Sequence, residues 1–167
     1  MRANRSFIAL LAVVVVASSC LEGALFVPDI ESVPFAPSLN VDLTNSTKTA
    51  SGLYYRDLLV GDGTQVLMVD GDDVGVRYRG WLRNAAAFDS NITAAAPLRF
   101  KTGSNAVIDG FDEGVRGMRV NGRRQIIIPP HLGYGSAGSA RIPANSILIF
   151  EVTLSALYAS DSTPTPP

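Results

Sequence analysis

A glycine-rich stretch near the middle of the chain, residues 107–118, constrains the fold more than any other segment. Its apolar residues recur at i, i+4 and i+7, the spacing of one helix face: Phe111, Val115 and Met118. Glycines form a second stripe at helical spacing: Gly110, Gly114 and Gly117. Each glycine costs about 0.5–1 kcal/mol relative to alanine inside a helix, so this helix is weak on its own. We therefore expect one short helix against which a β-sheet packs closely.

Five further segments have the alternation, or the β-branched and aromatic composition, of strands. They are residues 53–60, 74–79, 98–100, 123–129 and 147–157. Asn121-Gly122 is a tight-turn signal just before the fourth segment. Strands, one helix and then more strands predict an α+β fold, in which an antiparallel sheet carries the helix on one face. Residues 52–158 would form this domain, which has a common domain size.

Composition argues against several classes of function. The formal net charge is −1 and no basic block stands out, which argues against a nucleic-acid partner. One cysteine and one histidine cannot build a disulfide framework or a Cys/His metal cage, and we expect no metal or cofactor. The chain also lacks a nucleophile elbow, a phosphate loop and an H-E-x-x-H motif. The one histidine, His131, follows two prolines and is expected at the surface.

The first 20 residues have the pattern of an export signal. Arg2 and Arg5 precede an apolar run, residues 7–17, which is shorter than the roughly 20 residues that span a bilayer. A buried core helix is the alternative reading. Residues 17–20, Ala-Ser-Ser-Cys, resemble a bacterial lipobox, although alanine stands where leucine is usual. We predict lipidation of Cys20, which would anchor the protein in a membrane; ordinary signal cleavage nearby is the alternative.

The segments that flank the domain differ from it in composition. Residues 21–51 contain prolines and a polar run, and we expect them to form a flexible tether. Residues 159–167 are rich in proline, serine and threonine and are expected to be a disordered tail. Leucine rather than aspartate follows Cys20, which by resemblance to lipoprotein sorting favours the outer membrane. The expected location is therefore periplasmic or elsewhere in the cell envelope.

Within the domain, aromatic and branched residues gather in places that often form the rim of a pocket, several of them beside turn residues. They are Tyr78, Phe88, Phe100, Val107, Ile108, Phe111, Tyr134, Ile142 and Phe150. Ordinary core packing is the alternative, and periodicity alone does not separate the two. Because metal sites and the common catalytic motifs are excluded, an apolar pocket with a few polar groups is the kind of site that remains.

Five blocks give the chain a family resemblance. They are VRYRG (76–80), FDS (88–90), VIDGFDEGV (107–115), IPPHLGYG (128–135) and IPANSILIF (142–150). In order and spacing they resemble the FKBP-type peptidyl-prolyl isomerases, and they cover nearly all of residues 52–157. The resemblance implies an antiparallel sheet half wrapped around one short helix, as the pattern itself predicts. It also implies isomerisation of X–Pro bonds, with macrolide inhibitors as a second class of ligand; the export signal makes exported polypeptides the expected substrates.

The same resemblance implies roles for individual residues. The catalytic set would be Asp89, Tyr134, Phe111 and Ile108. The substrate-binding set would be Tyr78, Phe88, Leu98, Phe100, Val107, Ile142 and Phe150. Tyr78 is expected to hydrogen-bond Asp89, whereas Asp89 as a simple turn residue is the alternative. An FKBP-fold binding module or holdase with little catalytic activity is the alternative function.

Three positions depart from the family pattern. Phe111 stands where the family often has tryptophan, and Ala94 stands where some members have an arginine that pairs with the pocket aspartate. Arg141 occupies a place that is often apolar. These departures bear on affinity for macrolides more than on turnover.

Overall fold

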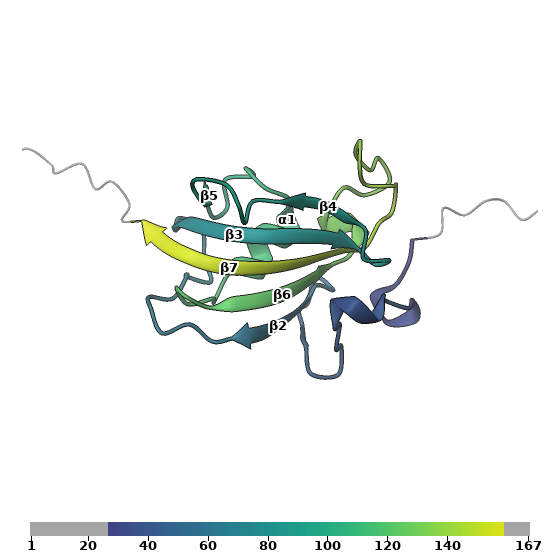
Figure 1. Cartoon of the computed structure of the whole chain (residues 1–167), viewed down its shortest axis with the longest axis horizontal. Coiled ribbons are helices and arrows are strands. Elements are labelled where there is room, and N and C mark those ends of the chain that lie inside the picture. Colours follow the sequence, from purple (N-terminus) through teal and green to yellow (C-terminus); the bar gives the residue numbers. More distant parts are fainter. Residues whose placement is uncertain (1–26, 159–167) are drawn as a thin grey trace, which may run out of the picture.

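The computed structural model describes residues 27–158, which form an antiparallel sheet with a helix behind it (Figure 1). The strands are β1 (Thr47–Lys48), β2 (Tyr54–Leu59), β3 (Asp73–Leu82), β4 (Ala87–Ser90), β5 (Leu98–Lys101), β6 (Arg123–Ile128) and β7 (Leu148–Tyr158). The helix is α1 (Asp109–Val115), and the short 3-10 turns are η1 (Ile30–Ser32), η2 (Pro37–Leu39) and η3 (Pro130–Leu132). The strand order is β1-β2-β6-β7-β3-β4, and β5 pairs with β3. The predicted α+β fold is confirmed.

The face of the sheet turned toward α1 carries the main core. In β7 the residues at alternate positions point into it and are at most 5% exposed: Leu148, Phe150, Val152 and Leu154. Strand β3 pairs with β7 along its whole length, so that Tyr78 lies opposite Val152 and Gly80 opposite Phe150. This register brings the aromatic residues of the two central strands together above the helix.

The glycines of α1 allow the helix to lie directly on β6. A Cβ atom at Gly110 would lie 2.4 Å from Ile128 Cγ2, and one at Gly114 would lie 2.6 Å from Ile126 Cδ1. The expected close approach of helix and sheet is therefore present. The helix is shorter than predicted, because Ile108 has extended backbone and Gly117, with φ of +73°, lies beyond its end.

A buried arginine fastens the end of the helix to the sheet. Arg124 on β6 is 4% exposed and its Nη1 donates to the carbonyl oxygens of Gly114 and Arg116. Its Nε and Nη2 donate to the carboxylate of Asp57 on β2. The guanidinium thus neutralises a carboxylate and satisfies two carbonyl groups that the end of a helix leaves without partners.

The segment before β2 does not extend away from the domain as the predicted tether would. Its described part, residues 27–51, includes η1, η2 and β1 and packs on the outer face of the sheet, opposite α1. Ile30 and Leu39 are buried there against Tyr54, Ile127 and Ile149. The predicted export signal, Cys20 and the predicted tail at 159–167 lie outside the described residues. No helix within residues 27–158 is long and apolar enough to span a membrane.

Candidate functional site: an aromatic cavity beside the helix

A cavity of about 220 Å³ lies between the inner face of the sheet and the first turn of α1. Its lining residues are Tyr78, Phe88, Asp89, Leu98, Ala106, Val107, Ile108, Phe111, Tyr134 and Phe150. Larger hollows among the described residues, of about 380, 500 and 580 Å³, do not gather several aromatic rings. We call this site the aromatic cavity.

The walls of the aromatic cavity are rings in edge-to-face contact. The Phe111 ring, from the helix, lies 5.4 Å from that of Tyr78 and 5.1 Å from that of Phe150. Phe88, from β4, lies 5.4 Å from Phe150. Such pairs are favoured by the quadrupoles of the rings and hold one another in fixed orientations. The cavity is therefore a preformed apolar surface rather than one that a ligand must assemble.

Asp89 is the one carboxylate among the residues that line this cavity. The Tyr78 hydroxyl donates to its Oδ2 at 2.6 Å, and the Ser90 backbone N–H donates to its Oδ1 at 2.8 Å. The expected hydrogen bond between Tyr78 and Asp89 is thus present. Burial, and then this hydrogen bond, raise the pKa of the Tyr78 hydroxyl well above its ordinary value, so that it remains a donor.

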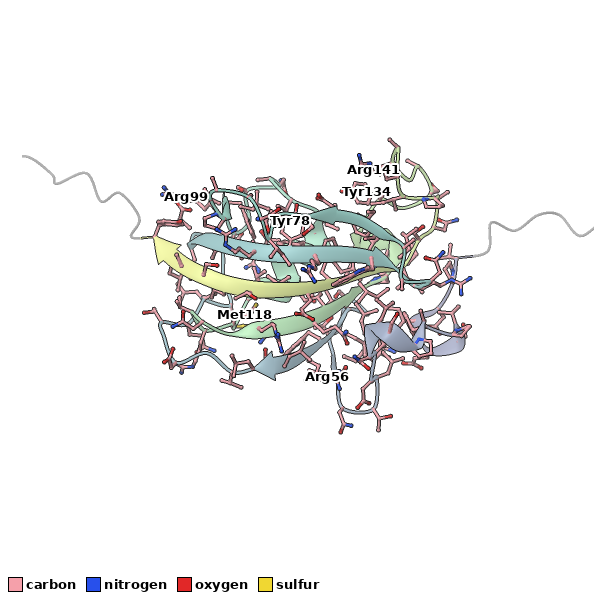
Figure 2. The ribbon with its side chains drawn as sticks, viewed as in Figure 1. Arg56, Tyr78, Arg99, Met118, Tyr134 and Arg141 are labelled. Atoms are coloured by element: carbon pink, nitrogen blue, oxygen red, sulfur yellow. The ribbon has the colours of Figure 1, made fainter. Side chains whose placement is uncertain are left out.

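Two polar groups at the cavity have no partner among residues 27–158. The backbone N–H of Ile108, just before the helix, makes no hydrogen bond there, and neither does the Tyr134 hydroxyl, on a residue that is 40% exposed. Figure 2 shows Tyr134 and Arg141 on the same loop after η3. Arg141 Nη1 lies 3.5 Å from the Phe88 carbonyl oxygen, so this loop reaches the cavity wall. The free N–H and O–H can each donate to a carbonyl of a bound chain.

Nine of the residues named from the sequence line the aromatic cavity, and two do not. Phe100 is 5% exposed and contacts the Phe111 ring at 6.0 Å, which places it behind the floor. Ile142 is 4% exposed and belongs to the core rather than the lining. Ala106, which sequence reasoning missed, lines the cavity beside Val107. Its small side chain gave no signal of its own.

The described part of the chain holds no cluster of three or more side chains suited to a metal ion. His131 is exposed, as expected, and its Nε2 lies 3.0 Å from the Ser51 carbonyl oxygen. The site thus offers apolar rings, one fixed carboxylate and free donors.

A protein-family model and known proteins each match more than half of this chain. A family model described as FKBP-type peptidyl-prolyl cis-trans isomerase matches residues 65–155. The FK506-binding protein of Neisseria meningitidis is 42% identical over 108 residues, which are 64% of this chain and 97% of that protein. The chain belongs to the FKBP family.

Two further matches place this FKBP domain among its relatives. The crystal structure of AtFKBP13 superposes with a TM-score of 0.61 at 33% identity, over 68% of this chain and 98% of that one. The FK506-binding protein 4 of Gibberella zeae is 42% identical over 142 residues, or 75% of this chain. This chain spans only 28% of the length of that fungal protein, and the rest of the fungal protein lies outside the matched region.

Proposed function

We propose that this FKBP-family protein is a peptidyl-prolyl cis-trans isomerase. The aromatic cavity carries the proposal: preformed rings surround one fixed carboxylate, and free donors stand at the rim. Its approximate volume of 220 Å³ suits a small apolar group such as a proline ring with its flanking carbonyls. Family membership and the names of the relatives support the same activity.

The cavity lowers the barrier to X–Pro rotation by removing water. That barrier, about 18–20 kcal/mol, comes from amide resonance, which places negative charge on the carbonyl oxygen. Water stabilises this planar, polar form more than the twisted one. An apolar enclosure lined by Phe111, Phe88 and Phe150 removes that preference, so the twisted amide is bound better than the planar one.

The polar groups hold the chain on either side of the rotating bond. The Ile108 N–H and the Tyr134 hydroxyl donate to substrate carbonyls, while Tyr78 holds Asp89 in one orientation. No acid, base or covalent step is needed, because no bond is made or broken.

Acceleration of a proline-limited refolding reaction tests this function. Asp89→Val and Phe111→Leu should each lower kcat/KM at least tenfold while the far-ultraviolet circular dichroism spectrum stays unchanged. Asp70→Val, on the exposed connection between β2 and β3, is the matched control and should keep the full rate. Full rates in both cavity variants would place the activity elsewhere or refute it.

A holdase is the second candidate, and an exposed apolar segment favours it. Leu67, Met68 and Val69 are consecutive and are 54%, 72% and 62% exposed, which is unusual for such side chains. Replacing all three with serine should abolish suppression of client aggregation if this candidate is right. Asp89→Val should leave that suppression intact, which separates the two functions.

We also propose that the protein is exported and anchored through a lipid on Cys20, with residues 1–20 as the signal and the outer membrane as the destination. The arginines, the apolar run and the lipobox-like end support this proposal. Mass spectrometry of the mature N-terminus should find a diacylated or triacylated Cys20, and Cys20→Ser should release the protein from membranes. An unmodified N-terminus created by cleavage elsewhere would contradict it.

Macrolide binding is proposed for the same aromatic cavity, because the relatives are named for binding FK506. Phe111 in place of a tryptophan removes an indole N–H from the floor. Competition between FK506 and a proline peptide, followed by calorimetry, tests whether the macrolide occupies this site.

A further inference from the structure

A second hollow, of about 580 Å³, lies on the outer face of the sheet, opposite the aromatic cavity. We call it the outer groove. It crosses β2, β6, β7 and β3 and is bordered by η2 and the residue that follows this turn. Its lining residues are Ser38, Leu39, Asn40, Arg56, Leu58, Arg79, Trp81, Ala85, Arg123, Gln125, Ile149 and Glu151. None of them lines the aromatic cavity.

A row of polar residues runs straight across the floor of the outer groove. Arg56 on β2 pairs in register with Gln125 on β6, which pairs with Glu151 on β7, which pairs with Arg79 on β3. Neighbouring strands lie about 4.8 Å apart, so the backbones of Arg56 and Arg79 are separated by about 14 Å along this row. Arg56 forms the β2 end of this row, and Figure 2 shows it beside the docked N-terminal segment.

The positive charge of the groove is only partly neutralised. Arg56 lies 3.3 Å from Asp42, and Arg123 lies 3.6 Å from Glu151. Arg79 is exposed and makes no ion pair with any residue in the range 27–158. Three guanidinium groups therefore line the hollow, two of them beside a carboxylate, and the charge of Arg79, which has no ion pair among the described residues, favours an acidic occupant.

A buried amide beneath the groove is also incompletely bonded. Gln125 is 5% exposed, and its Nε2 donates to the Leu39 carbonyl oxygen at 2.7 Å. Its Oε1 accepts no hydrogen bond from the described residues, and the Nε of Arg56 beside it donates none. Both atoms are closed to solvent, so they mark a polar layer beneath the floor of the groove and are not points that an occupant would contact.

We propose that the outer groove binds an extended acidic segment of a partner polypeptide. Two carboxylates about 14 Å apart would meet Arg79 at one end and Arg56 at the other, which is the separation of residues i and i+4 in an extended chain. The main-chain N–H groups between them would face Glu151. A compact anion such as phosphate fits less well, because it would bring its whole charge close to that same carboxylate.

The outer groove would hold a partner without occupying the aromatic cavity, because the two lie on opposite faces of one sheet. Residues alternate along β3, so Tyr78 points to the cavity and Arg79 to the groove. This inference therefore does not depend on the proposed isomerase activity.

The single tryptophan of the chain makes the test direct, since Trp81 lines the groove. We would titrate the full chain with the proline-free peptide Ser-Glu-Thr-Ser-Thr-Glu-Ser and follow Trp81 emission at low salt. The expected result is a saturable change that weakens as salt rises. Arg79→Gln should weaken binding about fivefold or more, whereas Arg119→Gln, an exposed arginine outside the groove, should not change it.

Three results would overturn the proposal. The first is no saturable change in Trp81 emission with the acidic peptide. The second is equal binding of the same peptide with glutamine in place of each glutamate. The third is an equal response to inorganic phosphate, which would show a site for a small anion instead of a polypeptide. None of these readouts involves proline isomerisation, so they are separate from the test of the enzyme.

Discussion

The Tyr78 hydroxyl donates a 2.6 Å hydrogen bond to Asp89 Oδ2, and both side chains line the aromatic cavity. Tyr78→Phe removes this bond and keeps the ring. We expect kcat/KM for a proline peptide to fall about twofold to tenfold, the equivalent of one hydrogen bond. The variant should still fold, since the ring contacts with Phe111 and Phe150 remain.

Tyr158→Phe is the matched control for that experiment. This tyrosine ends β7 and lies outside the cavity lining, so its variant should keep the full rate. A Tyr78→Phe enzyme as active as the wild type would show that the orientation of Asp89 does not need the tyrosine.

The raised pKa of Tyr78 predicts a dependence of stability on alkaline pH. Burial and then the bond to Asp89 raise this pKa above its ordinary value of 10.0, so the folded state binds the proton more tightly than the unfolded state. The contribution of the protonated Tyr78 hydroxyl to stability is complete below pH 10.0 and is lost as the pH rises toward the folded-state pKa. The free energy of unfolding of Tyr78→Phe, measured with denaturant, should therefore be lower than that of the wild type by a constant amount at neutral pH. This difference should shrink above pH 10.0.

Absorbance at 295 nm provides an independent readout. The Tyr78→Phe variant should lose one phenolate from the most alkaline part of the tyrosine titration. Loss of a phenolate from the part near the ordinary pKa would contradict the assignment.

The contact between Gly114 and Ile126 predicts that even one methyl group will destabilise the domain. A Cβ at Gly114 would lie 2.6 Å from Ile126 Cδ1 and 2.7 Å from Cγ2, on a side chain that is fully buried. Overpacking of this kind costs about 1–3 kcal/mol, against a gain in helix propensity of at most about 1 kcal/mol. Gly114→Ala should therefore lower the free energy of unfolding, measured by denaturant titration.

A double-mutant cycle checks the cause. Ile126→Val deletes Cδ1, so Gly114→Ala should cost less in that background than in the wild type. Equal costs in the two backgrounds would mean that the methyl group strains something other than this contact.

The docked N-terminal segment predicts that Ile30 stabilises the domain, although it lies before every strand. It is 3% exposed and packs with Ile127 and Ile149 on the outer face. Ile30→Ala should cost about 2–5 kcal/mol in unfolding free energy. Val27→Ala, at a residue that is 56% exposed, should change it by no more than about 0.5 kcal/mol. Equal, small effects of both would indicate that the segment detaches in solution.

The sequence predicted the inner face of the sheet far better than the outer face. Alternation in β3 and β7 identifies the inward residues because a strand with one core face has a period of two. Residues 27–51 have no such period, and their prolines suggest a tether. The overlooked signal was on the strands they cover: Ile127 and Ile149 point outward yet are 1% exposed, so something had to cover them.

Within the site, residue type identified the aromatic wall but not the depth of each residue. Phe100 and Ile142 match the family pattern, yet they are at most 5% exposed and do not line the aromatic cavity. A pattern of side chains cannot distinguish a wall from the layer that supports it, because both are apolar and buried. The end of the helix was misplaced for a related reason, since Gly117 continues the spacing although its positive φ lies outside the helix.

Strand β3 has a practical consequence for anyone who redesigns this protein. Tyr78 and Arg79 are adjacent in the chain, but a pleated backbone sends their side chains to opposite sides. The aromatic cavity can thus be altered at Tyr78, and the outer groove at Arg79, in two adjacent codons. A one-residue insertion there would exchange the two surfaces and destroy both.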